Sequence, residues 1–152
     1  MDNHNFFMEQ CIALGKKAML KGNPPVGALV VKENKVLGIG MEAGISSKDI
    51  TRHAEIEAVK DALKNNPKIN LSDCILYTTH EPCIMCSYVL RHYKLKTIIY
   101  GTEVAHVGGI TSDLPVLKTT QVPNWGNPPI IIGNILNKEC DNLSEVYKKT
   151  LD

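Results

Sequence analysis

Four side chains from two short motifs could together form a hydrolytic metal site. The tripeptide His-Ala-Glu occupies positions 53–55, and the pentapeptide Pro-Cys-Ile-Met-Cys occupies positions 82–86. One imidazole and two thiolates supply three ligands of a tetrahedral Zn²⁺ and leave the fourth position open to water. A zinc ion with an open position brings the pKa of that water close to neutral, which makes it a nucleophile. We therefore predict one Zn²⁺ per chain bound by His53, Cys83 and Cys86, with Glu55 as the catalytic residue that transfers protons.

Two other roles for the paired cysteines remain open at this point. A Cys-x-x-Cys pair can be a redox centre, or half of a structural zinc site that needs a second Cys-x-x-Cys or a histidine pair. The remaining thiols, Cys11, Cys74 and Cys140, stand alone in the sequence, as is typical of small buried apolar residues. A redox pair also has no need of His-Ala-Glu upstream. The catalytic zinc site is therefore favoured.

Length and composition indicate one domain, residues 1–152, with 43% hydrophobic residues to fill a core. Seventeen basic and 16 acidic residues leave a formal net charge of +1, which gives no reason to expect a nucleic-acid surface, although a local patch remains compatible with it. The N-terminus lacks the pattern of a secretory signal, and the apolar runs are too short to span a bilayer. An odd number of cysteines suits a reducing compartment. We expect a cytoplasmic protein.

Periodicity predicts alternating helices and strands. A helix near 6–20 ends at Gly22-Asn23-Pro24-Pro25, residues 26–32 and 35–41 form a hairpin, and Thr51 is expected to cap a helix over 52–64. A strand at 74–78, a helix at 83–93 and a strand at 97–100 follow, with the two strands parallel because a helix connects them. After a loop over 101–129 come a strand at 130–132 and a helix at 134–151.

This order places the chemistry at helix starts within one α/β/α layer. His53 falls at the start of one helix, and Cys83 and Cys86 fall at the start of another. The i, i+3 spacing of the cysteines puts both thiols on one helical face. Helix N-termini carry partial positive charge, which favours thiolates. The sequence therefore predicts zinc where two helix N-termini meet.

The same motifs carry a family resemblance. The segments 25–28, 51–55, 76–86 and 99–101 resemble the cytidine and deoxycytidylate deaminase superfamily, in the branch of guanine deaminases, fungal-type cytosine deaminases and tRNA adenosine deaminases. The likeness extends from about residue 6 to residue 147. It implies a three-layer α/β/α cytidine deaminase-like fold with a five-stranded mixed sheet flanked by helices. It also implies zinc-dependent hydrolysis of an amino group and assembly as a homodimer.

Substrate contacts are predicted where the chain matches or departs from these relatives. Glu42 stands eleven positions before His53, where relatives carry an asparagine that binds the substrate ring; an ionised carboxylate only accepts hydrogen bonds. If the loop is shifted, Glu42 is instead a solvated surface acid. Arg52 could pair with Glu42 or Asp49, contact an anionic substrate group, or lie on the surface. The remaining predicted contacts are Ala54, His80, Glu81, Asp113 and Trp125, with His106 as a further candidate.

Three functions compete. The main prediction is deamination of a free nucleobase or small amino-substituted heterocycle, with guanine first and cytosine or an aminotriazine next. The alternative is a tRNA-specific adenosine deaminase, which must grip an anticodon loop. Those relatives carry an Arg-Asp pair after the fourth strand, where this chain has Glu103-Val104, so a small-molecule substrate is preferred over nucleic acid. A non-catalytic zinc-stabilised scaffold would have no need of Glu55 beside an open metal position.

Overall fold

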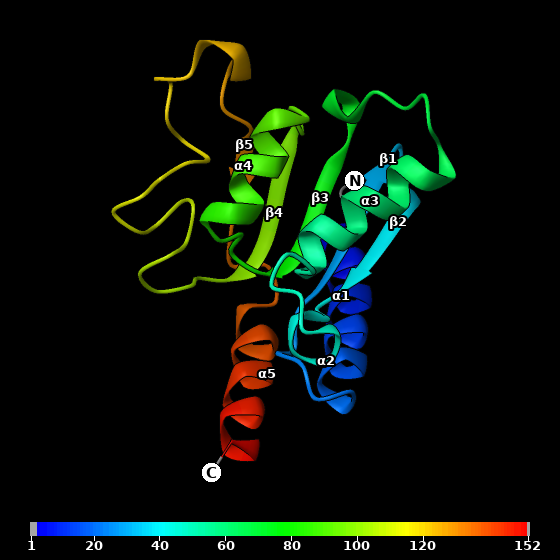
Figure 1. Cartoon of the computed structure of the whole chain (residues 1–152), viewed down its shortest axis with the longest axis vertical. Helices are drawn as coiled ribbons and strands as arrows, with labels where there is room; N and C mark the ends of the chain where they lie inside the picture. The colour runs from blue at the N-terminus through cyan, green and yellow to red at the C-terminus, as the bar shows by residue number, and fades with distance from the viewer. Residues whose placement is uncertain (1–2, 152) are drawn as a thin grey trace.

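Five strands pair in the order β2-β1-β3-β4-β5 to form a mixed sheet (Figure 1). The computed structural model describes residues 3–151. β1 pairs antiparallel with both β2 and β3, whereas β3, β4 and β5 run parallel. The predicted hairpin and the predicted parallel pair are therefore confirmed. The strands are β1 Gly27–Lys32, β2 Lys35–Met41, β3 Ile75–His80, β4 Thr97–Thr102 and β5 Ile130–Ile132.

Long helices cover both faces of this sheet. The helices α1 (His4–Leu20) and α5 (Asn137–Thr150) pack on one face, and α3 (Ala54–Asn65) and α4 (Ile84–His92) pack on the other (Figure 1). A short helix, α2 (Gly44–Ser47), lies between β2 and α3. The predicted three-layer α/β/α fold is confirmed.

Alternation of side chains along the strands gives each face its own apolar cluster. Val30, Leu76 and Ile98 face α3 and α4, while their neighbours in sequence face α1 and α5. On the first of these faces Gly40 allows α3 to approach β2 closely, since a Cβ at this position would lie 2.0 Å from the carbonyl oxygen of Ala54. The N-terminal end of α3 is thereby held against the sheet.

The start of α3 corrects one expectation. His53, not Thr51, is the N-cap, and the helix begins at Ala54. The Thr51 hydroxyl donates to Asp49 at 2.6 Å, and the Ala43 N–H donates to the Arg52 carbonyl at 3.0 Å. These contacts place Thr51 in a turn before α3, so its hydroxyl is already bonded to Asp49 and cannot cap the helix. Smaller shifts occur at α4, which begins after Cys83 as N-cap, and at α5, which begins at residue 137 instead of 134.

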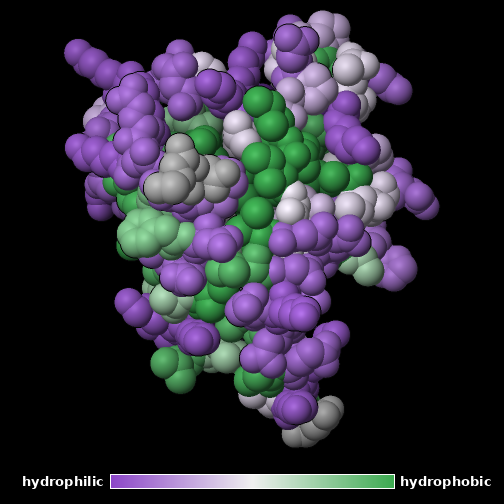
Figure 2. Space-filling view, turned by 180° about the vertical axis from the view of Figure 1, so that it is seen from behind, coloured by the Kyte–Doolittle hydropathy of each residue, from purple (hydrophilic) through white to green (hydrophobic). Residues whose placement is uncertain are grey.

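The last strand, β5, is the least covered part of the sheet. Its Ile130 side chain is 57% exposed. Figure 2 shows a band of apolar surface on this side of the molecule, running between polar flanks toward the seam between α1 and α5. Among residues 3–151, no helix is both long enough and apolar enough to cross a membrane.

Candidate metal centre and active site

The three predicted zinc ligands lie together where α3 and α4 begin. His53 is the N-cap of α3, Cys83 is the N-cap of α4, and Cys86 lies in the first turn of α4. The His53 Nδ1 atom is 3.5 Å from Cys83 Sγ and 3.4 Å from Cys86 Sγ. All three donor atoms lie within 4.8 Å of one another. This donor set and spacing suit a tetrahedral Zn²⁺ with one open position.

Protons are distributed unevenly within this cluster. A hydrogen bond from Cys86 and a weaker one from His53 lower the pKa of Cys83 to about 4 against the effect of burial. The hydrogen bond with Cys83 raises the pKa of His53 to about 9, and the same thiolate, together with burial, raises the pKa of Cys86. These shifts favour an imidazolium–thiolate pair beside a thiol before a metal binds. Metal binding must release protons here, because zinc ligands bind deprotonated.

Glu55 is buried beside the cluster, with 4% of its surface exposed. Burial, followed by the charge of Cys83, raises the pKa of Glu55 to about 7. A carboxyl group with a pKa near neutral can both accept and donate a proton during a reaction. Since Glu55 lines the same pocket as His53 and Cys83, its carboxyl group is placed for proton transfer.

The pocket that contains these residues has a volume of about 390 Å³, within the range of small-ligand sites. Separate segments of the chain contribute its walls. Ile45, Ile50 and Val107 are 58%, 79% and 45% exposed, so the pocket has an apolar mouth open to solvent. We call this space the catalytic pocket. Its other lining residues are Pro24, Val26, Glu42, Gly44, His53, Glu55, His80, Glu81, Cys83 and Val104.

Glu42 lies in the catalytic pocket and is only 7% exposed. The alternative of a solvated surface acid is therefore excluded. Its Oε2 atom accepts a hydrogen bond from the Gly44 N–H at 3.0 Å, and burial raises its pKa. A substrate contact by Glu42 stays a prediction.

His80 forms part of the pocket wall, and both of its ring nitrogens already have partners. Nδ1 lies 2.8 Å from Thr79 Oγ1, and Nε2 lies 2.7 Å from Ser144 Oγ on α5. Burial lowers the pKa of His80 to about 4, so the ring is neutral near pH 7. His80 therefore ties the pocket wall to α5.

Glu81 also lines the catalytic pocket, but its carboxylate is occupied by the chain itself. Both oxygens accept hydrogen bonds from the segment after β4: Oε1 from Val104 N–H and Thr111 O–H, and Oε2 from Ile110 N–H and Thr111 N–H. Although burial opposes ionisation, these bonds lower the pKa of Glu81. Because each oxygen of this carboxylate already accepts two hydrogen bonds, a substrate contact by Glu81 stays a prediction without support from the geometry.

Three predicted contacts lie outside the pocket lining. Asp113 is exposed on the long loop, and Ala54 is fully buried with its methyl group in the core. Trp125 packs on the outer side of α4, with its ring 5.6 Å from Tyr88 and 5.0 Å from the Arg91 guanidinium carbon. Ala54, Asp113 and Trp125 are therefore not among the residues that line the catalytic pocket, and their contact with substrate stays a prediction. His106 is likewise exposed and outside the lining.

Arg91 holds the later part of the long loop on α4, and the sequence reasoning missed it. This side chain is 1% exposed and donates to the carbonyls of Val116 at 2.8 Å, Thr119 at 2.9 Å and Gly126 at 3.3 Å. The guanidinium thus draws residues 116–126 onto α4. The sequence did carry a signal for it: Arg91 falls on the same helical face as Leu90 and Ser87, a face that is buried, and an arginine there must find partners inside the protein.

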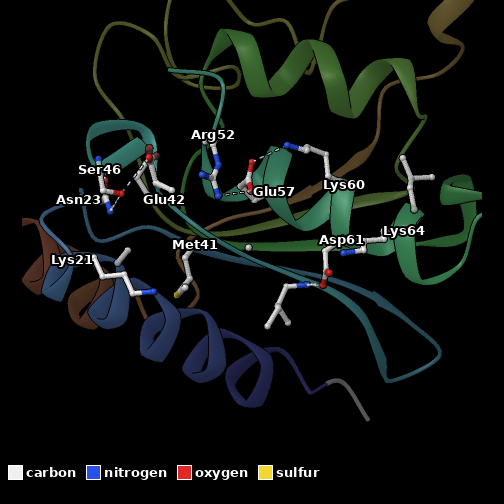
Figure 3. A pocket seen from close by; sticks show the side chains of 15 residues that line it. Lys21, Asn23, Met41, Glu42, Ser46, Arg52, Glu57, Lys60, Asp61 and Lys64 are labelled. Atoms are coloured by element: carbon white, nitrogen blue, oxygen red, sulfur yellow. Dashed lines mark hydrogen bonds and ion pairs between the residues drawn. The ribbon is translucent and has the colours of Figure 1, made fainter. Parts of the chain in front are cut away.

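A second hollow, of about 800 Å³, lies on the other side of Glu42 between the end of α1, β2 and α3 (Figure 3). Arg52 points into it and pairs with Glu57 at 3.4 Å, and Glu57 also pairs with Lys60 at 3.3 Å. Of the alternatives left open for Arg52, pairing with Glu42 or Asp49 is therefore not the one that the structure shows. Arg52 pairs with Glu57 because Glu57 lies in the first turn of α3, which starts just after Arg52.

Comparisons with known proteins agree with this geometry. Residues 1–102 match the family model of the cytidine and deoxycytidylate deaminase zinc-binding region. The chain is similar to a tRNA-specific adenosine deaminase of Aquifex aeolicus, with 33% identity over 95% of this chain and 93% of that protein. A solved structure from a study of A-to-I editing by tRNA:A34 deaminases superposes with a TM-score of 0.83 and 23% identity over 91% of this chain and 98% of that one. The X-ray structure of guanine deaminase from Bacillus subtilis superposes with a TM-score of 0.63 and 34% identity, over 67% of this chain and 66% of that one.

The donor set itself fits the zinc ion that this family uses. One imidazole nitrogen and two sulfurs converge from two helix starts, and Glu55 is buried close by. Fold, metal-binding residues and family match therefore lead to one conclusion. The chain belongs to the cytidine and deoxycytidylate deaminase family, zinc-dependent hydrolases that remove an amino group from a cyclic amidine.

Proposed function

We propose that this chain deaminates adenosine within tRNA, converting adenosine and water to inosine and ammonia. The observation that carries this proposal is the 33% identity to the Aquifex aeolicus tRNA-specific adenosine deaminase over nearly the whole of both chains. The preferred prediction, deamination of a free base such as guanine, is overturned by this finding: the adenosine deaminase is 33% identical over 95% of the chain, whereas the guanine deaminase structure of similar identity matches 67% of it. The preference for a small molecule over tRNA rested on Glu103-Val104 and on a net charge of only +1. One dipeptide in a loop and an overall charge balance are weaker evidence than similarity over nearly the whole chain.

We further propose that His53, Cys83 and Cys86 hold the zinc ion through Nδ1 and the two Sγ atoms. A zinc ion bound there supplies a Lewis acid that activates water for attack. The chain provides the proton transfers. As oxygen bonds to the ring carbon that bears the amine, the Glu55 carboxylate takes a proton from the attacking water and delivers it to the ring nitrogen. It then transfers the second proton to the departing amine, which leaves as ammonia.

The shape of the catalytic pocket supports a base presented from a longer strand. A volume of about 390 Å³ is enough for one extruded base, and enzymes of this kind act on bases that are single-stranded or flipped out. The exposed side chains Ile45, Ile50 and Val107 provide an apolar mouth against which neighbouring bases can stack. Glu42 and His80 would contact the base inside.

A homodimer is part of the same proposal. The outer face of α4 exposes Tyr88 (57%) next to Trp125, and Tyr93 (38%) is exposed at the C-cap of the same helix. Exposed aromatic side chains are enriched at protein interfaces. Sedimentation equilibrium of the zinc-loaded protein should give twice the chain mass of 16.8 kDa.

The decisive experiment is inosine formation in an anticodon stem–loop RNA with adenosine at the wobble position. Zinc-loaded protein should raise the RNA mass by about one dalton, the difference between an amine and a carbonyl oxygen, and release an equal amount of ammonia. RNA with the same adenosine inside a perfect duplex is the control and should remain unchanged. Ammonia release from free guanine, cytosine or adenine, with no inosine in the RNA, would refute the proposal.

A further inference from the structure

The segment after β4 forms one wall of the catalytic pocket, and it holds no regular secondary structure of its own. Val104 and Val107 line the pocket from this segment, which spans residues 103–111 and is called the valine wall below. Val107 is 45% exposed, so packing around its side chain does little to fix its place. Some other contact must hold the valine wall beside Cys83.

The Glu81 carboxylate, which follows β3, supplies that contact because the valine wall folds around it. It is 2% exposed and accepts four hydrogen bonds between 2.7 and 3.0 Å, one from Val104, one from Ile110 and two from Thr111. These donors come from both ends of the valine wall. One buried anion therefore gathers a loop in the way that a bound ligand would, and charged acceptors make the stronger hydrogen bonds.

Two glycines show that the segment is built around this carboxylate. A Cβ at Gly108 would lie 2.3 Å from Glu81 Oε2, so the backbone passes directly against the anion. Next to it, the Gly109 N–H donates to the Pro82 carbonyl at 2.8 Å, and Gly108 forms a bridge with Cys83. The valine wall is thus folded over the turn that carries the first cysteine of the metal cluster.

From these contacts we infer that Glu81 is a positioning residue, which sets the substrate-facing wall of the catalytic pocket by binding the backbone of residues 104–111. It acts through Val104 and Val107, which line the pocket but carry no group able to bind zinc or transfer a proton. Loss of Glu81 should therefore weaken substrate binding more than the chemical step. In kinetic terms KM rises while kcat changes little, the pattern of lost uniform binding.

The test compares Glu81→Ala and Glu81→Gln with the matched control Glu103→Gln. Glu103 is exposed in the same segment, so its variant removes a charge without removing a hydrogen bond to the loop. Removing the buried acceptor strands several donors, for which we expect KM to rise roughly tenfold in Glu81→Ala. Glu81→Gln should fall between, because an amide keeps one acceptor oxygen and turns a donor toward the Val104 or Ile110 N–H. The kcat should stay within about threefold, as expected when only substrate binding is lost.

Zinc content and hydrogen exchange make the result independent of which substrate is used. Zinc should remain at one per chain in every variant, and amide exchange should accelerate in residues 103–112 of Glu81→Ala but not of Glu103→Gln. Should Glu81→Ala fail to fold, Thr111→Val removes one of the four bonds and carries the same measurements. Loss of zinc together with activity, or unchanged exchange in 103–112, would overturn the inference.

The kinetic arm rests on the proposed function and uses the wobble-adenosine stem–loop. If wild-type protein does not deaminate that RNA, the proposed function fails while the exchange and zinc measurements still decide the role of Glu81. If wild-type protein is active and Glu81→Ala shows faster exchange with an unchanged KM, the valine wall does not contribute to substrate binding and the inference fails alone.

Discussion

Two sides of the catalytic pocket are built in different ways. The metal corner consists of His53, Glu55, Cys83 and Cys86, all within two short motifs at the starts of α3 and α4. The opposite side combines β2 and its following turn, the end of β3 and the loop after β4, joined by hydrogen bonds between segments distant in sequence. The difference separates two tasks. Helix geometry fixes the residues for the reaction, whereas long-range contacts decide which substrate reaches them.

Removal of the metal should have the largest effect, because the metal corner has no other electrophile. Cys86→Ser should lose zinc and reduce deamination by more than about 10⁴-fold, beyond the loss of about 10²–10⁴-fold from a single general acid–base group. The matched control is Cys74→Ser, another buried thiol that lies outside the cluster. Metal analysis and inosine formation measure the two outcomes. A zinc-free Cys86→Ser protein with near-normal turnover would contradict the metal corner as the reaction centre.

The next largest effect belongs to Glu55. Glu55→Gln keeps the size of the side chain but removes the proton acceptor, so kcat should fall by about 10²–10⁴-fold. Zinc content and melting temperature should remain near those of the wild type, since the neutral amide is also tolerated in a buried position. Single-turnover kinetics on the stem–loop RNA measure the chemical step directly. Turnover within a few fold of wild type would exclude Glu55 as the proton shuttle.

Most of the metal corner could be predicted from the sequence because its determinants are local. Spacing i, i+3 places Cys83 and Cys86 on one helical face, and the prediction that His53 would meet them at a second helix start is matched by distances of 3.4 and 3.5 Å. Even here the cap of α3 was wrong, since Thr51 bonds to Asp49. The hairpin of β1 with β2, the parallel pairing of β3 with β4 and the α/β/α layering also followed from alternating β-rich and helical patterns.

The substrate side could not be predicted for a physical reason. Residues 101–129 have no hydrophobic period, and their path depends on two buried charges, Glu81 and Arg91, that bind mainly the loop backbone. Sequence similarity in short stretches suggested Asp113 and Trp125 as contacts, but Asp113 is exposed on the loop, Trp125 packs beside Arg91 on α4, and neither lines the catalytic pocket. Knowing where a loop lies requires knowing which buried group satisfies its backbone.

Substitution of Glu42 tests the substrate side of the catalytic pocket directly, because this side chain lines the pocket. It has one backbone donor partner, Gly44, and burial raises its pKa, so a substrate donor would find an acceptor there. Glu42→Asn should reduce kcat/KM on the native substrate by about tenfold, the usual cost of one buried hydrogen bond. Zinc content should not change.

The matched control for Glu42 is Glu57→Gln, since Glu57 lines only the hollow on the far side and pairs there with Arg52 and Lys60. It should leave kcat/KM nearly unchanged, because Glu57 and its two ion-pair partners do not line the catalytic pocket. Comparison of both variants across RNA and free bases measures selectivity. Equal effects from the two substitutions would mean that Glu42 influences the site only through the general field of charge.

The smallest predicted effect is on stability. It tests whether His80 holds the pocket wall to α5 through hydrogen bonds of a neutral ring. Burial lowers the pKa of His80 to about 4, against about 6.5 for a free histidine. Between these values the unfolded chain binds a proton that the folded chain does not, so the free energy of unfolding should fall as the pH falls from about 6.5 to about 4. The slope contributed by His80 is at most about 1.4 kcal/mol per pH unit.

The variant His80→Gln retains groups able to bond Thr79 or Ser144 but cannot be protonated, so it should flatten this dependence of unfolding free energy on pH. Urea unfolding of wild type, His80→Gln and the exposed control His106→Gln, each at the same zinc concentration, measures the difference. An identical slope in wild type and His80→Gln would mean that the ring is protonated within the fold, and the link between the pocket wall and α5 would then need a charged partner such as Asp141.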